Sequence, residues 1–276
     1  MSLPYLEIAF RTGKDRQLKD ILIAELGDAG FESFVDEKDG FLAYIPEPEL
    51  NEQNLLELIN RVAPGIVWEK KIIPPQNWNA VWEAQFDPIR LTENCVIRAP
   101  FHPPVKDGSI ELIIEPKMSF GTGHHATTRM MCKAMFSIQF EGKKVLDMGC
   151  GTGVLGILAA KLGASSVTGI DIEEWAVENA IENAGRNDVS MEVKKGGAEQ
   201  ISTEAFDIIL ANINRNILLA DGHAYAAALK NNGYILLSGF LETDVSALLE
   251  SYVALGFTDK KTIGEENWRC ILFLKR

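Results

Sequence analysis

The chain has 276 residues, which exceeds what one compact core usually needs, so we expect two domains. Its 46% hydrophobic and 24% charged residues are typical of a globular protein and exclude a disordered one. No apolar run reaches the ~18 residues of a membrane helix, and the N-terminus lacks a secretion signal, so we expect a cytoplasmic protein without a membrane partner. The net charge of -12 disfavours direct binding to nucleic acid, whose phosphates attract basic side chains, and favours a basic partner.

Cysteine and histidine spacing predicts neither a disulfide framework nor a metal site. The cysteines form no Cys-x-x-Cys pair, and the histidines do not have the i, i+4 spacing of zinc ligands on a helix. These residues are Cys95, Cys132, Cys150, Cys270, His102, His124, His125 and His223. We therefore expect reduced thiols and no metal.

The first 73 residues have the pattern of a small α+β domain. A strand-like alternation at residues 5–10 is followed by an apolar stripe at helical spacing from Leu18 to Leu26. Residues 31–35 and 41–45 flank a charged turn, as in a hairpin, and a second helix and a last strand follow near residues 55–62 and 66–73. The order βαββαβ predicts a ferredoxin-like domain over residues 1–73.

Pro74 and Pro75 interrupt strands and helices alike, so residues 74–90 are expected to be a linker with a short helix that carries Trp78 and Trp82. In residues 91–276 strands alternate with helices, which predicts a doubly wound α/β domain with a parallel, Rossmann-like sheet. The expected strands are residues 110–114, 145–148, 167–170, 191–193, 206–211 and 234–237. Residues 257–263 and 268–274 follow each other closely and predict a final antiparallel hairpin.

A glycine-rich loop joins the strand of residues 145–148 to the next helix. Gly149 and Gly151 leave room for a ligand to approach the backbone at a helix N-terminus. The Gly-x-Gly-x-x-Gly pattern that starts at Gly151 also matches the fingerprint of dinucleotide-binding domains, so a nicotinamide enzyme competes with a methyltransferase. Asp147 favours the methyltransferase, because a carboxylate at the mouth of the loop would repel a pyrophosphate and attract the ammonium and sulfonium groups of S-adenosylmethionine.

Two polar residues are expected at the carboxyl edge of the sheet. Asp171 lies about 20 residues beyond the loop, where an acidic side chain accepts hydrogen bonds from the ribose hydroxyls of either cofactor. An alternative role for Asp171 is the N-cap of a helix that begins near Glu173. Asn212 follows the strand of residues 206–211, which places its amide near the reacting group, and its alternative role is a turn residue that caps the following helix.

The segment Phe120-Gly-Thr-Gly123-His-His-Ala-Thr127-Thr128, the glycine loop and Ala211-Asn212-Ile213 together resemble the bacterial PrmA family, whose members methylate a protein of the large ribosomal subunit. The resemblance covers nearly the whole chain. It implies S-adenosylmethionine as methyl donor and lysine side chains or an N-terminal amine as acceptors. It also implies that Asn212 is the catalytic residue, because its amide would orient the amine. The expected cofactor-binding residues are Phe120, Gly121, Thr122, Gly123, Thr128, Asp147, Gly149, Gly151, Asp171 and Asn212.

The chain departs from the family pattern in the loop and after Asn212. His124 and Ala126 stand where the family has Thr and Pro, and Asn214 stands where it has Leu, which affects the stiffness of the loop and the substrate pocket. We expect His125 to support the loop through a hydrogen bond and to have no catalytic role. Two other functions remain open: a methyltransferase acting on RNA or a small molecule, and a donor-binding regulatory module without turnover.

Negative charge is concentrated at the start of the chain. Residues 1–65 contain 13 acidic and 6 basic residues, a difference of -7, which is more than half of the total net charge. Such a surface attracts basic partners and repels RNA. We therefore expect the first domain to recruit a basic ribosomal protein and to be dispensable for binding the methyl donor.

Overall fold

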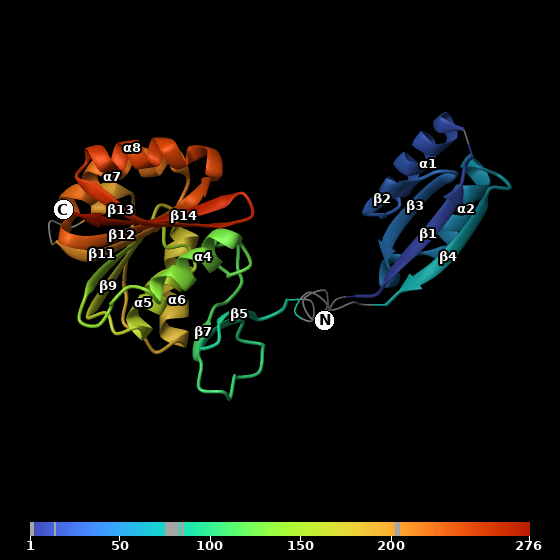
Figure 1. Ribbon diagram of the computed structural model, residues 1–276. Helices are drawn as coiled ribbons and strands as arrows, with labels where there is room; N and C mark the ends of the chain where they lie inside the picture. Colours follow the sequence, from blue (N-terminus) through green and yellow to red (C-terminus); the bar gives the residue numbers. More distant parts are fainter. Residues whose placement is uncertain (1–2, 14, 75–82, 84–85, 202–204) are drawn as a thin grey trace. The chain divides into compact units, whose positions relative to one another are not determined.

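The computed structural model describes residues 3–13, 15–74, 83, 86–201 and 205–276 (Figure 1). The chain divides into two compact units, Met1–Phe86 and Asp87–Arg276. Most of the linker expected at residues 74–90, including its helix with Trp78 and Trp82, lies outside the described residues. Each unit has a buried core of its own.

The first unit is an antiparallel sheet with two helices packed against one face. Its main elements are β1 (Tyr5–Arg11), α1 (Arg16–Asp28), β2 (Ser33–Glu37), β3 (Gly40–Pro46), α2 (Glu52–Val62) and β4 (Val67–Ile73). The strand order in the sheet is β2-β3-β1-β4. Leu22 of α1 and Leu58 of α2 pack in one cluster with Ile8 and Phe41 of the strands, so this face of the sheet forms the core of the unit.

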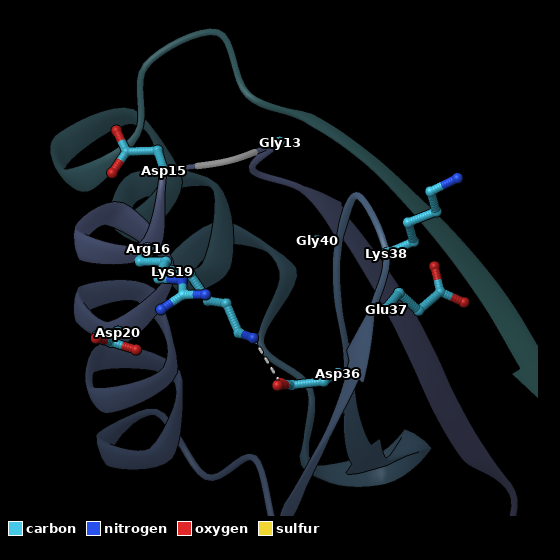
Figure 2. Close-up of a pocket in the computed structure, with 9 residues that line it drawn as sticks. All are labelled: Gly13, Asp15, Arg16, Lys19, Asp20, Asp36, Glu37, Lys38 and Gly40. Atoms are coloured by element: carbon cyan, nitrogen blue, oxygen red, sulfur yellow. Dashed lines mark ion pairs between the residues drawn. The ribbon is translucent and has the colours of Figure 1, made fainter.

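A hollow of about 710 Å³ lies between α1 and the turn that joins β2 to β3 (Figure 2). Its wall carries side chains of both charges. Lys19 pairs with Asp36 at 2.6 Å, Glu37 pairs with Arg11 at 2.5 Å, and the Asp15 side chain caps α1. Because these charged groups already have partners, they favour a solvated surface over a ligand site.

A seven-stranded sheet forms the centre of the second unit. Its strands are β8 (Lys144–Met148), β9 (Ser166–Asp171), β10 (Glu192–Lys195), β11 (Phe206–Asn212), β12 (Leu229–Leu241), β13 (Phe257–Glu265) and β14 (Trp268–Lys275). Their order is β10-β9-β8-β11-β12-β14-β13. Neighbours are parallel from β10 to β12, and β14 is antiparallel to both β12 and β13. The doubly wound sheet and the final hairpin predicted from the sequence are therefore present.

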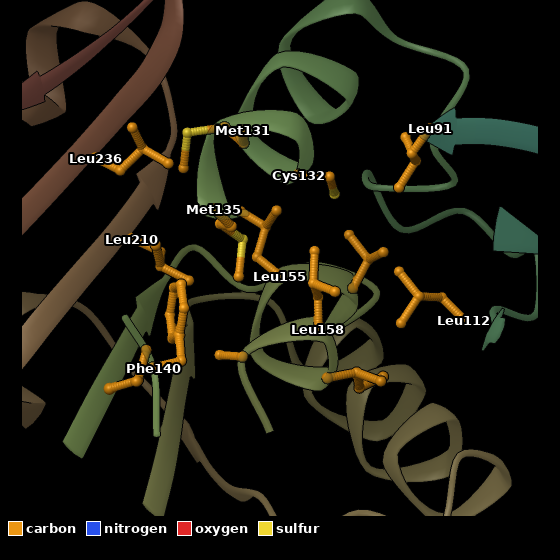
Figure 3. Packing of buried hydrophobic residues seen from close by; sticks show 14 of the residues in the cluster. Leu91, Leu112, Met131, Cys132, Met135, Phe140, Leu155, Leu158, Leu210 and Leu236 are labelled. Atoms are coloured by element: carbon orange, nitrogen blue, oxygen red, sulfur yellow. The ribbon is translucent and has the colours of Figure 1, made fainter. Parts of the chain in front are cut away.

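Helices cover both faces of this sheet (Figure 1). On one face lie α4 (Ala126–Met135), α5 (Val154–Lys161) and α6 (Glu174–Arg186), and on the other lie α7 (Arg215–Ala228) and α8 (Val245–Ala254). Successive residues of β11 enter different cores: Leu210 packs in the cluster with Met131 of α4 (Figure 3), and Ile209 packs in the cluster with Leu218 of α7. This double burial explains the run of consecutive apolar residues from Ile208 to Ala211 in β11. Among the described helices, none has the length and apolar character to cross a bilayer.

One predicted strand lies in a different sheet. The sequence pattern predicts residues 110–114 in the main sheet, but β7 (Ile110–Ile113) pairs with β6 (Cys95–Arg98), which pairs with β5 (Ile89–Thr92), in a separate three-stranded sheet. Strands as short as β5 and β6 show too little alternation to be recognised in the sequence. The side chain of Asn187, the C-cap residue of α6, bonds to β7 as the backbone of a neighbouring strand would: it accepts from the Ile113 N–H at 2.9 Å and donates to the Ile113 carbonyl at 2.7 Å.

Candidate functional site

The connections of the second unit reverse direction between β8 and β11. From β8 the chain moves outward to β9 and β10, and it then returns to β11 on the other side of β8. In open α/β sheets, such a reversal leaves a crevice at the carboxyl ends of the two strands, and ligands bind there. Met148 pairs with Ala211, so the next residues, Gly149 and Asn212, lie side by side at this edge.

A pocket of about 310 Å³ opens at this edge of the sheet. Its wall includes five of the predicted donor-binding residues: Phe120, Gly149, Gly151, Asp171 and Asn212. These residues come from segments far apart in the sequence, and the sheet topology brings them together. The pocket is therefore the candidate site for the ligand that the glycine loop predicts.

Backbone conformation and close neighbours explain why two positions of the glycine-rich loop require glycine. Gly149 and Gly151 have φ angles of 67° and 55°, which side-chain-bearing residues rarely adopt. A Cβ atom at Gly149 would overlap the side chain of Ile213, and one at Gly151 would overlap the carbonyl of Phe120. The loop can approach these neighbours only with glycine at both positions.

The N–H groups of the glycine loop are already bonded within the protein. Those of Gly149 and Cys150 donate to the Ile170 carbonyl at 2.8 and 3.1 Å, and that of Gly151 donates to the Asp171 carboxylate at 2.9 Å. The next N–H groups, at residues 152 and 153, donate to the carbonyls of Phe120 and Cys150. A dinucleotide pyrophosphate binds through such N–H groups, so this geometry argues against the nicotinamide alternative.

The remaining predicted residues of the loop segment lie outside the pocket wall and support it. Thr128 is buried behind Asn212, whose Nδ2 lies 3.5 Å from the Thr128 Oγ1. The carbonyl of Gly121 accepts a hydrogen bond from the Thr152 hydroxyl at 2.9 Å, which attaches the segment to the glycine loop. Thr122 contacts the His124 ring at 3.3 Å. Next to it, Gly123 has no room for a side chain, because a Cβ there would press on Ile97.

Asp147 does not lie at the mouth of the loop, and that expectation is wrong. Its side chain is buried beneath the loop, where Oδ2 accepts from the Gly156 N–H at 2.8 Å and Oδ1 has no hydrogen-bond partner among the described residues. Burial raises the pKa of Asp147 to about 7, an effect to which the Asp171 charge adds, while the Gly156 hydrogen bond opposes it. Asp147 is therefore not placed to repel a pyrophosphate at the mouth of the loop, and only the bonded N–H groups of the loop disfavour a dinucleotide there.

Asp171 lies in the pocket wall with a fixed carboxylate. Oδ2 accepts from the Gly151 N–H at 2.9 Å and Oδ1 accepts from the Glu173 N–H at 3.1 Å. The alternative role as N-cap is wrong, because α6 begins at Glu174 and its N-cap residue is Glu173. Each carboxylate oxygen accepts more than one hydrogen bond, so both oxygens retain capacity for two ligand hydroxyls.

Asn212 lies at the end of β11, and its amide oxygen is unpaired among the described residues. The alternative role as helix cap belongs to Asn214, whose side chain accepts from the Ile217 N–H at 3.2 Å at the start of α7. The Asn212 Oδ1 atom is buried and has no hydrogen-bond partner within the described part of the chain. A buried amide oxygen without a partner is costly, so this atom favours a ligand that donates a hydrogen bond.

The other departures from the family pattern have structural roles in the described chain. The His124 carbonyl accepts from Arg129, and Ala126 is buried in the first turn of α4.

His125 is the N-cap residue of α4, and its ring makes edge contacts with Phe120 at 5.1 Å and Trp268 at 4.8 Å between ring centroids. His125 thus supports the loop, as expected.

A row of buried asparagines on α6, not predicted from the sequence, also supports the pocket. Asn179 donates to the Ser119 hydroxyl at 3.0 Å, and Asn183 donates to the Thr152 carbonyl at 3.0 Å. With Asn187, they are spaced at i, i+4 and i+8 on one helix face, and that spacing was the signal in the sequence. The row connects the segment before Phe120 to the glycine loop and so fixes two walls of the pocket.

Acidic, cysteine and histidine side chains of the described residues form no group of three or more that could hold a metal ion. The cysteines at positions 95, 132, 150 and 270 are buried and form no disulfide with one another. Burial raises the pKa of the Cys95 thiol to about 11.

The model of one protein family, Ribosomal protein L11 methyltransferase (PrmA), matches residues 31–276. The chain belongs to this family. It is 46% identical over 260 residues to the ribosomal protein L11 methyltransferase of Porphyromonas gingivalis, a match that covers 92% of this chain and 90% of the relative. The ribosomal protein L11 methyltransferase of Bacteroides fragilis is 38% identical over 279 residues, with 99% of this chain and 100% of the relative covered.

Among solved structures, the ribosomal protein L11 methylase of Lactobacillus delbrueckii subsp. bulgaricus superimposes with a TM-score of 0.64 and 25% identity, over 69% of this chain and 100% of that chain. A methyltransferase from Pyrococcus furiosus shares the fold, with a TM-score of 0.52 and 19% identity, over 59% of this chain and 89% of that chain. As a member of its family the chain is a methyltransferase with S-adenosylmethionine as methyl donor.

Proposed function

We propose that this methyltransferase transfers methyl groups to amino groups of a ribosomal protein of the L11 type, on lysine side chains and the N-terminal amine. The observation that carries the proposal is the buried Asn212 Oδ1, which has no partner among the described residues and lies beside the glycine loop at the reversal of the sheet. An amine donates hydrogen bonds, and this oxygen accepts them. The names of the relatives, each a ribosomal protein L11 methyltransferase, support the choice of substrate.

The donor site that we propose follows the pocket wall. Asp171 would accept hydrogen bonds from the two ribose hydroxyls of S-adenosylmethionine. The backbone of Phe120, Gly149 and Gly151 would enclose its methionine part. Thr128 would act by holding the Asn212 amide at its Nδ2. Asp147 would support the loop from below through the Gly156 N–H.

When bound, S-adenosylmethionine supplies an electrophilic methyl group on a sulfonium. The residues of the chain have to present a neutral amine in line with that group, because positioning provides much of the rate. A lysine with a pKa of about 10.4 is mostly charged at neutral pH, so removal from water in the pocket helps its deprotonation. Asn212 would hold the amine through its Oδ1 without acting as a strong base.

We propose further that residues 1–73 are a ferredoxin-like domain that recruits the basic protein substrate, that residues 74–90 link it, and that residues 91–276 carry out the transfer. The element order βαββαβ and the sheet order β2-β3-β1-β4 support the domain type. The excess of 13 acidic over 6 basic residues in residues 1–65 supports a basic partner.

Mass spectrometry tests the proposed reaction. The full chain is incubated with S-adenosylmethionine and either a purified ribosomal protein of the L11 type or ribosomal RNA. Mass increases of whole methyl groups on lysines of the protein, and none on the RNA, are expected. Methylation of RNA alone would contradict the proposal and favour the alternative substrate class.

A further inference from the structure

The order of the strands determines how the methyl donor would be oriented in the proposed site. Gly149 and Asn212 follow the central strands β8 and β11, Asp171 ends β9, and Gly196 follows β10, the outermost strand. If the ribose binds Asp171 as proposed above, the methionine part would extend toward Gly149 and Asn212, and the adenine would lie on the opposite side of Asp171, toward Gly196.

Three apolar side chains of the pocket wall are exposed to solvent. Ile172 is 62% exposed, Trp175 is 44% exposed and Ile217 is 38% exposed, and each lines the pocket. The Trp175 indole is oriented by a hydrogen bond from its Nε1 to the Glu173 carboxylate at 3.2 Å. A planar base placed between these side chains would remove their apolar surface from water.

One acidic side chain of α7 lines the same pocket. Asp221 lies one turn after Ile217, on the same face of α7. Its Oδ2 accepts from the Tyr225 hydroxyl at 3.3 Å, and its Oδ1 makes no hydrogen bond with any described residue. Tyr225 is fully buried, and the other carboxylate oxygen of Asp221 remains available to a ligand.

We propose that Asp221 accepts a hydrogen bond from the exocyclic amine of the donor's adenine and thereby selects adenine over hypoxanthine; the proposal rests on the donor site proposed above. A carboxylate only accepts hydrogen bonds. Adenine presents an amine at the position where hypoxanthine presents a carbonyl oxygen, which a carboxylate would repel. Stacking on Trp175 acts on either base, so it contributes affinity without selectivity.

Ligand binding to the full chain tests this role. S-adenosylhomocysteine and S-inosylhomocysteine, which differ only at the base, are titrated into the wild type by calorimetry. A charge-assisted hydrogen bond to the amine predicts a preference for the adenine compound of about tenfold or more. Asp221→Asn, whose amide also donates, is expected to reduce that preference to about threefold or less.

Two control variants separate recognition from structure. Tyr225→Phe removes the hydroxyl that donates to Asp221 but keeps the carboxylate, and Asp259→Asn makes the same change at an exposed site on β13. Both are expected to retain the wild-type preference. Equal binding of the two compounds to the wild type, or an unchanged preference in Asp221→Asn, would overturn the role of Asp221 alone. Failure of the wild type to bind either compound would overturn the donor site as well.

Discussion

Replacing Asp171 by alanine tests the donor site at its most directly placed residue. The carboxylate is fixed by the N–H groups of Gly151 and Glu173, and each oxygen retains capacity for one ribose hydroxyl. A hydrogen bond to a charged group contributes about 1.5 kcal/mol at the lower end of its usual range, which suits a partly exposed side chain. Loss of two such bonds should weaken the binding free energy by about 3 kcal/mol. The dissociation constant for the donor product should therefore rise roughly a hundredfold.

Calorimetry with S-adenosylhomocysteine measures this change, and thermal unfolding shows whether the variant is folded. Glu174→Ala provides a matched control, because Glu174 is an acidic residue at the start of α6 that pairs with Lys195 outside the pocket. It should bind the ligand like the wild type. If Asp171→Ala binds within about threefold of the wild type while folded, the ribose assignment is refuted.

Other consequences of the structure are tested in separate measurements. Because burial raises the pKa of Asp147 to about 7, the folded state retains a proton that the unfolded state loses near pH 4, so stability should fall as pH rises from about 4 to about 7. Denaturant unfolding at about pH 4 and about pH 7 should show a smaller fall in the free energy of unfolding for Asp147→Asn than for the wild type. An equal fall in the two proteins would contradict the raised pKa of Asp147. A chain that begins at Pro74 should bind S-adenosylmethionine but lose methylation of the ribosomal protein, and salt above ~0.15 M should raise the KM of the full chain; full activity of the shortened chain would show that the first unit does not recruit. Calorimetry should detect no binding of NAD, since the N–H groups of the glycine loop are already bonded, and micromolar NAD binding would reverse that reasoning.

The positions of Asp171 and Asn212 could be predicted from the sequence because they depend on topology alone. A residue at the carboxyl end of a parallel strand lies at the ligand-binding edge whatever its side chain does. The glycine loop was recognisable for the same reason, since a strand, a glycine cluster and a helix follow each other directly.

The features that could not be predicted depend on where side chains point and which strands pair. Asp147 stands next to the loop in the sequence, but its side chain is directed into the interior and ends beneath Gly156. Residues 110–114 have the pattern of a strand, but that pattern does not say which neighbour it pairs with. Asp221 looks like an ordinary polar helix residue until the fold shows which face of α7 borders the pocket.

The most direct test of the account compares methyl transfer and donor binding in Asn212→Ala. Single-turnover methylation of the ribosomal protein should fall up to about tenfold, the effect of one lost hydrogen bond of ~1 kcal/mol to the neutral amine, while the affinity for S-adenosylhomocysteine should change less than about twofold. Asn214→Ala is the matched control, because its amide also borders the pocket but is engaged in capping α7, so stability should fall by about 1 kcal/mol with little effect on transfer. Wild-type transfer rates in Asn212→Ala would show that the Asn212 amide does not orient the amine.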